Sequence, residues 1–98
     1  LEVHHIVAVE HLRMAHTPYS ESNAPSIAIS SALHATLSAR IGGEQKYLGG
    51  RPRIGGDDTG SNKFAASKYE IAELYRQIYT NHTPFHELFA IAKRILRT

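Results

Sequence analysis

Histidine side chains offer most of the chemistry in this sequence. The 98 residues include seven histidines and no cysteine, which excludes disulfide bonds and thiolate metal sites. Two imidazoles that converge with open positions between them suit a divalent cation. A third imidazole kept neutral beside that cation is able to take a proton from water, because its unperturbed pKa is about 6.5. With a cation to stabilise charge on a phosphate, such a set suits phosphodiester hydrolysis. The candidates are His4, His5 and His34, with Asn23 between them in the chain.

The elements expected around these side chains would bring them together. Residues 1–9 predict a strand rich in β-branched residues, 10–24 have loop composition, and 25–29 predict a second strand. A helix follows, with a serine cap at 30–31 and an end at the glycine pair 42–43. A strand–loop–strand–helix order places the first strand beside the start of the helix. We therefore expect a histidine of the first strand to approach the helix histidine.

The segment LEVHHI, a later Asn23 and a helix carrying His34 together resemble the HNH, or ββα-metal, nuclease motif. The wider pattern of HHI, APSIAIS and SALH is similar to C-terminal toxin domains of polymorphic, Rhs-type secreted effectors. The resemblance covers residues 1–43. In one subset of the family a second histidine follows the helix histidine by four residues, where this chain has Ser38.

The resemblance implies a role for each of these residues. His4 and His34 would hold one divalent ion (Mg²⁺, Mn²⁺, Ni²⁺ or Zn²⁺), His5 would act as general base, and Asn23 would orient that base or touch the metal. The implied function is a DNA endonuclease toxin that is secreted or delivered into a target cell and acts in its cytoplasm. Its producer would need an immunity protein, and a basic cleft predicts an acidic surface on that partner.

A glycine-rich basic segment follows the helix. All seven glycines lie between residues 42 and 60, a composition typical of a long functional loop. Residues 49–56 resemble an AT-hook, although a flexible basic loop is the simpler interpretation. The basic residues expected to hold substrate phosphates are Arg40, Lys46, Arg51 and Arg53.

The remainder of the chain predicts two helices. Apolar positions at helical spacing predict one over residues 64–79, and Thr83-Pro84 is typical of the start of a second. Lys93, Arg94 and Arg97 suit the negative end of that second helix. Tyrosines 69, 75 and 79 are expected to pack in the core, histidines 11, 16 and 82 to lie on the surface or in loops, and His86 to act as a capping partner.

Length and composition set the domain organisation. Hydrophobic residues at 42% and charged residues at 20% are typical of one small globular domain. We expect an α+β fold over 1–98: a ββα-metal unit (1–43), a glycine-rich loop (44–62) and a helical subregion with two packed helices (63–98). No apolar run is long enough to span a membrane. The first residue, Leu1, suggests a domain cut from a longer protein.

Charge and motif order leave a second, non-enzymatic interpretation open. Residues 1–39 carry one basic and three acidic residues, whereas 40–98 carry ten basic and six acidic, so the second part would meet a polyanion more readily. The segment IGGEQKYLGGRPR followed by two helices has some likeness to Mor-type phage activators. A small DNA-binding regulator, Mor-like or AT-hook-like, is therefore the alternative. RNA cleavage is a further option, and zinc deamination is disfavoured because its paired cysteines are absent.

Overall fold

The structure is a computed structural model and describes residues 1–44, 66–81, 83 and 85–98. Two strands pair antiparallel in a small sheet, and helices precede and follow the second strand. The expected α+β class is therefore confirmed. The elements in chain order are β1 (Glu2–His5), α1 (Val9–Met14), β2 (Ser26–Ile29), α2 (Ser31–Glu44), α3 (Lys68–Asn81) and α4 (Glu87–Leu96).

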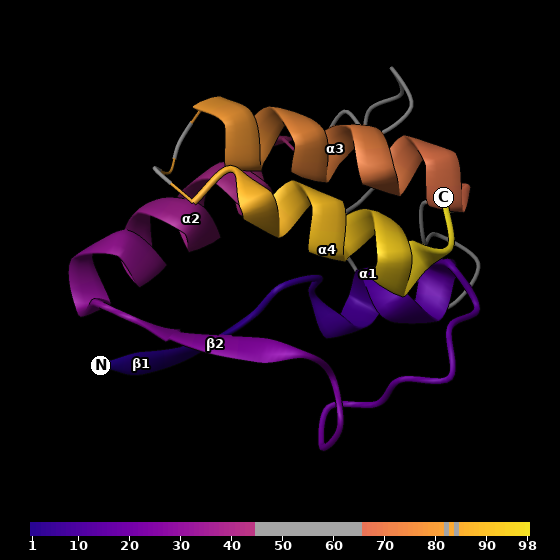
Figure 1. Cartoon of the computed structure of the whole chain (residues 1–98), viewed down its shortest axis with the longest axis horizontal. Coiled ribbons are helices and arrows are strands. Elements are labelled where there is room, and N and C mark those ends of the chain that lie inside the picture. The colour runs from indigo at the N-terminus through magenta and orange to yellow at the C-terminus, as the bar shows by residue number, and fades with distance from the viewer. Residues whose placement is uncertain (45–65, 82, 84) are drawn as a thin grey trace.

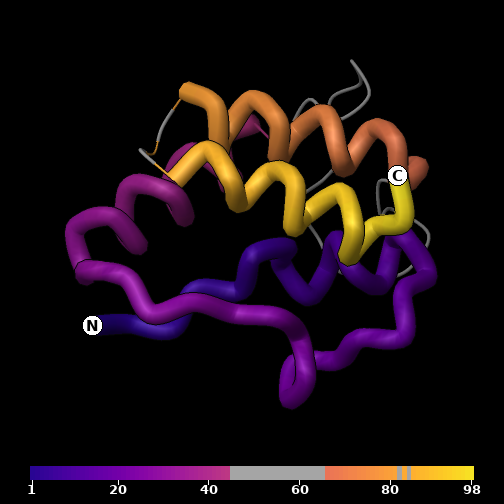
Figure 2. The backbone as a smooth tube through the Cα atoms, in the orientation of Figure 1, coloured from indigo at the N-terminus to yellow at the C-terminus, as the bar shows by residue number. Residues whose placement is uncertain are grey.

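The helices lie on one side of the strand pair. Figures 1 and 2 show α3 and α4 side by side and running in opposite directions, with α1 and the two strands below them. α2 leaves the end of β2 and contacts both β1 and α3. A single apolar core fills the space between these elements. Its most buried members are Val7, Leu12, Leu37, Ile71, Tyr75, Ile78, Tyr79, Ala92 and Leu96.

β1 is shorter than expected, and a helix occupies part of the predicted loop. β1 ends at His5 instead of residue 9, and the chain bends at Ile6 and Val7 before α1 begins at Val9. The loop prediction for 10–24 is therefore wrong at its start. A helix of six residues has little stability of its own. Burial of Leu12, which no local pattern reveals, supports it.

α2 begins as predicted and ends later. Ser30 is the cap, because its Oγ accepts the backbone N–H of Leu33 at 3.1 Å. The predicted end at Gly42 and Gly43 is wrong, since α2 continues to Glu44. Glycine costs only about 1 kcal/mol relative to alanine inside a helix, and the buried Ile41 anchors this last part of α2 against the core.

α3 and α4 replace the two predicted C-terminal helices with shifted bounds. α3 starts at Lys68 because Ser67 and Glu70 form a capping box, with the Oγ and Oε1 of these residues accepting each other's backbone N–H at 3.2 and 3.0 Å. Thr83 Oγ1 accepts the N–H of Phe85 ahead of α4. Pro84 lies outside the described residues.

Among the helices that the structure describes, none is long and apolar enough to cross a membrane.

Candidate functional site

The structure brings His4 and His34 together. Their ring centres are 5.7 Å apart and the ring planes meet at 72°. The strand register explains this proximity: Glu2 pairs with Ile29, directly before α2, so the start of β1 lies beside the first turn of that helix. Both histidines line one hollow of about 300 Å³, together with Val3, His5, Ala8, Val9, Glu10, Ser38, Ile41 and Gly42.

A carboxylate orients His34. Glu2 Oε1 lies 2.6 Å from His34 Nδ1, and this hydrogen bond is the main reason that the pKa of Glu2 is lowered. A carboxylate can only accept a hydrogen bond, so His34 Nδ1 carries the proton that bonds Glu2. His34 Nε2 is the ring nitrogen that Glu2 does not contact. Glu2 was not predicted as a site residue. The sequence feature that could have indicated Glu2 is its two-residue spacing from His4, which places both side chains on one face of β1.

A tyrosine of α3 orients His4. His4 Nε2 lies 2.9 Å from Tyr79 Oη, and the Tyr79 hydroxyl donates its proton to the carbonyl oxygen of Ile6. A hydroxyl has one hydrogen, so His4 Nε2–H must be the donor to Tyr79. Burial, followed by the nearby charges of His34 and His5, lowers the pKa of His4 to about 4. His4 is therefore neutral at pH 7 and holds a lone pair on Nδ1.

The second ring nitrogens, His4 Nδ1 and His34 Nε2, are open to solvent. In the described part of the chain, every side-chain N or O atom buried within a non-exposed residue has a hydrogen-bond partner. Neither His4 Nδ1 nor His34 Nε2 makes a hydrogen bond there. Both atoms must therefore be reachable by solvent. The side chains are fixed through one nitrogen and open at the other, as in metal sites whose histidines are oriented by outer partners.

No family model, curated protein or solved structure matches this chain. The likeness to HNH nucleases therefore rests on the sequence motif alone.

His5 shares the hollow, whereas Asn23 does not. Neighbouring residues of a strand point to opposite faces, yet His5, the half-buried last residue of β1, is among the residues that line the same hollow as His4. Asn23 is exposed, and its Oδ1 accepts the N–H and the hydroxyl of Ser20 at 2.7 and 3.2 Å. It thus organises its own loop ahead of β2 and is not among the residues that line the hollow.

The distance between the two imidazoles is in the range expected for two ligands of one divalent ion. With nitrogen–metal distances of about 2.1 Å, two histidines on one ion have ring centres roughly 5–6 Å apart, which agrees with the separation of His4 and His34. In the residues that the structure describes, no group of three histidine, aspartate or glutamate side chains is placed to hold a metal. Water or substrate oxygens would supply the other ligands.

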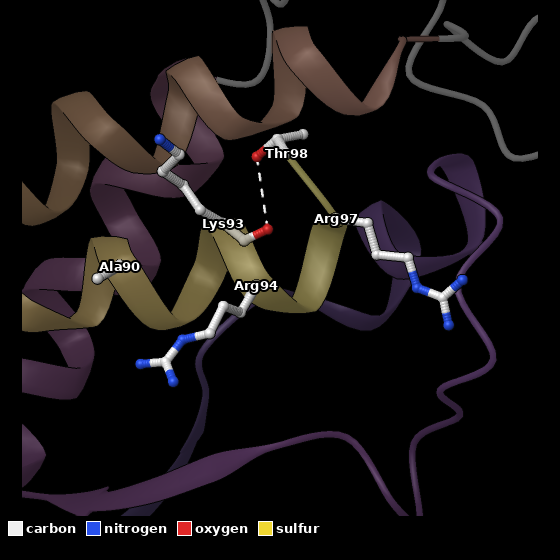
Figure 3. Close-up of a pocket in the computed structure, with 5 residues that line it drawn as sticks. All are labelled: Ala90, Lys93, Arg94, Arg97 and Thr98. Atoms are coloured by element: carbon white, nitrogen blue, oxygen red, sulfur yellow. Dashed lines mark hydrogen bonds between the residues drawn. The ribbon is translucent and has the colours of Figure 1, made fainter.

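The predicted phosphate-binding residues are only partly described. Arg40 is exposed on α2, and Lys46, Arg51 and Arg53 lie outside the described residues. A second hollow, lined by Ala90, Lys93, Arg94, Arg97 and Thr98, lies at the end of α4 and shares no residue with the histidine hollow. Figure 3 shows Arg94 and Arg97 reaching away from α4 in different directions. These positively charged side chains suit the C-terminal end of α4, which carries the negative end of the helix dipole. The side chains of Arg94 and Arg97 do not point toward a common site.

A second histidine–tyrosine pair lies beside the first. His11 Nδ1 is 2.7 Å from Tyr75 Oη, which also accepts the backbone N–H of Ala8 at 2.8 Å. The surface or loop position predicted for His11 is wrong: its side chain is fully buried. Tyr75 bonds its Nδ1, and Glu10 Oε1 lies 3.8 Å from its Nε2, as expected for a buried polar group. Tyr75 and Tyr79 pack in the core as expected, whereas Tyr69 is exposed.

The lowered pKa of His4 makes a prediction about stability. Between pH 6.5 and 4 the unfolded chain protonates this imidazole and the folded chain does not. The contribution to stability is thus complete above pH 6.5 and is lost as the pH falls toward 4, by up to about 3 kcal/mol. Urea unfolding at pH 7.5 and pH 5 measures it. We expect His4→Gln to reduce this pH dependence and His86→Gln to retain it; equal pH dependence in all three proteins would contradict the prediction.

Proposed function

We propose that this chain is a metal-dependent endonuclease domain of the HNH type that hydrolyses DNA phosphodiester bonds. The observation that carries the proposal is the meeting of His4 and His34, each anchored through one ring nitrogen and open to solvent at the other. A neutral His4 supports it further, because a protonated imidazole has no lone pair for a metal.

His4 and His34 would hold the divalent ion. When bound, the ion would supply stabilisation of negative charge on the scissile phosphate and on the leaving oxygen. Two neutral imidazoles suit Zn²⁺, Ni²⁺ or Mn²⁺, whereas a shell completed by water and phosphate oxygens also suits Mg²⁺. Water and substrate oxygens would fill the other positions around the ion.

His5 is the general base of this proposal. It is among the residues that line the hollow with His4 and is half-buried, and in this proposal its imidazole contacts a water bound there. The proton passes from that water to the unprotonated ring nitrogen of His5 as oxygen attacks phosphorus. Asn23, by bonding Ser20, supports the loop that leads into β2, the strand that pairs with His5 through Ser26.

The deciding experiment is strand scission. Purified protein is incubated with supercoiled plasmid and Mg²⁺, Mn²⁺, Ni²⁺ or Zn²⁺, each with an EDTA control. We expect nicked and linear DNA with at least one ion and none with EDTA. Plasmid binding without cleavage under every ion would overturn the nuclease proposal and favour the DNA-binding regulator.

The antiparallel, side-by-side packing of α3 and α4 differs from the crossed helices of a helix-turn-helix motif. The described helices therefore give the alternative of a DNA-binding regulator no support.

The basic residues after His34 are proposed to hold the DNA backbone. Replacing Arg51 and Arg53 together by alanine should weaken binding to duplex DNA in EDTA and reduce the slope of log K against log[salt] by about 2. Arg76→Ala is the control, because Glu73 already pairs with that guanidinium at 2.6 Å. A slope that is the same in the double variant and in the wild type would show that Arg51 and Arg53 do not contact phosphates.

The biological setting follows from the family likeness. We propose that the domain acts as a toxin delivered into a target cell and that its producer makes an immunity protein. Such a partner would present acidic side chains to the substrate-binding arginines.

A further inference from the structure

We propose that Tyr79 of α3 is a positioning residue that keeps the proton of His4 on Nε2 and so directs Nδ1 into the hollow as the metal-binding nitrogen. The inference rests on the proposed function, in which His4 and His34 hold a divalent ion. It adds a residue from outside the segment that resembles HNH nucleases, and it assigns the coordinating atom of His4.

The hydrogen-bond directions carry this assignment. The Ile6 carbonyl has no proton, so the contact between Tyr79 Oη and that oxygen uses the only hydrogen of the hydroxyl. The contact between Tyr79 Oη and His4 Nε2 at 2.9 Å then requires a proton on the nitrogen. Both partners are buried, His4 at 4% and Tyr79 at 0% exposure, so the alternative tautomer would place two lone pairs against each other away from water. That arrangement leaves a buried polar group without a hydrogen bond, which is unfavourable.

The ionisation of Tyr79 does not undo the assignment. Burial raises the pKa of the Tyr79 hydroxyl above its usual value, so the phenol keeps its proton at neutral pH. The Ile6 carbonyl belongs to the bend that ends β1. The Tyr79 hydroxyl oxygen therefore bonds both the ring of His4 and the backbone carbonyl of Ile6, two residues later. The tautomer and the orientation of the His4 imidazole both depend on this hydroxyl.

The chain supplies a matched control for Tyr79. Tyr75 lies one turn earlier on α3, is equally buried, and also bonds a histidine and a backbone group, here His11 and Ala8. The two tyrosine rings are 5.7 Å apart. Tyr75→Phe removes the same hydroxyl from the same part of the core. Tyr75 bonds neither His4 nor the Ile6 carbonyl.

The first test reads the tautomer without metal. Long-range ¹H–¹⁵N spectra of the ¹⁵N-labelled wild-type protein at pH 7 distinguish protonated from unprotonated ring nitrogens. We expect His4 wholly in the Nε2–H form, with a ring N–H that is protected from exchange with water. In Tyr79→Phe we expect that protection to be lost, and in Tyr75→Phe we expect it to persist. A wild-type His4 protonated on Nδ1 overturns the proposal even if neither variant folds, and so does unchanged protection in a folded Tyr79→Phe.

The second test uses Zn²⁺ alone, with no DNA. Titration of the wild-type protein should shift the Nδ1 resonance of His4 and the Nε2 resonance of His34. By calorimetry, Tyr79→Phe should bind Zn²⁺ about 10–100-fold more weakly, and Tyr75→Phe should stay within about threefold of the wild type. Zinc bound through Nε2 of His4, or equal affinities in both variants, overturns the positioning role. No zinc-induced change at any histidine overturns the metal site of the proposed function itself.

Discussion

His5→Ala is expected to lower the rate of plasmid cleavage by about 10²–10⁴-fold, which is the usual contribution of a positioned general base. The affinity for the metal should change little, because the nitrogens open to a cation belong to His4 and His34. His5 is half-buried at the end of β1, and its backbone pairs with Ser26 whatever its side chain. The variant should therefore fold. Single-turnover cleavage at saturating metal measures the effect.

A matched histidine variant makes this result interpretable. His86 precedes α4, is exposed, and makes no side-chain capping bond, so His86→Ala should cleave at the wild-type rate. Full activity in His5→Ala would remove His5 as the base. An equal loss in both variants would indicate that cleavage responds to something other than the hollow beside His4.

His34→Ala is expected to weaken metal binding by more than about 100-fold, because it removes one of two side-chain ligands outright, whereas outer partners of a ligand are worth about 10–100-fold. The side chain is 32% exposed, so its loss should cost the fold little. Zinc calorimetry and cleavage at increasing metal concentration should show the same deficit. His4→Ala is less informative, since it also removes a buried imidazole and leaves Tyr79 without a partner.

Excess metal separates a binding defect from a chemical one. Cleavage by His34→Ala should recover in part as the metal concentration rises, whereas cleavage by His5→Ala should not. Glu2→Gln should fall between wild type and His34→Ala in zinc affinity, because the amide oxygen still accepts from Nδ1 without the charge. Wild-type zinc affinity in His34→Ala would remove this residue from the metal site.

The sequence predicted the approach of two histidines because that depends on element order alone. An antiparallel strand pair followed directly by a helix places His4 beside His34, and the apolar spacing of α3 revealed Tyr75 and Tyr79 as core residues. The partners of those side chains were not predictable. Helical spacing shows that a tyrosine is buried, but not which distant group its hydroxyl will meet, and both tyrosines bond residues more than sixty positions away.

Local rules also failed where tertiary burial opposed them. Gly42 and Gly43 indicated a helix end, yet α2 continues through them beside the buried Ile41. His11 looked like a loop residue because its own segment has loop composition, whereas the structure buries it against Tyr75 of α3. Glu2 was overlooked for a related reason: its importance comes from His34, which lies on another element.

The bond between His4 and Tyr79 has a consequence for the order in which the histidine pair becomes organised. β1, β2 and α2 precede α3 in the chain, and domains form as the chain emerges from the ribosome. The hydroxyl that fixes His4 belongs to α3. His4 therefore lacks its orienting partner until α3 has been made, and a fragment that stops after α2 would carry both histidines without the hydroxyl that orients one of them.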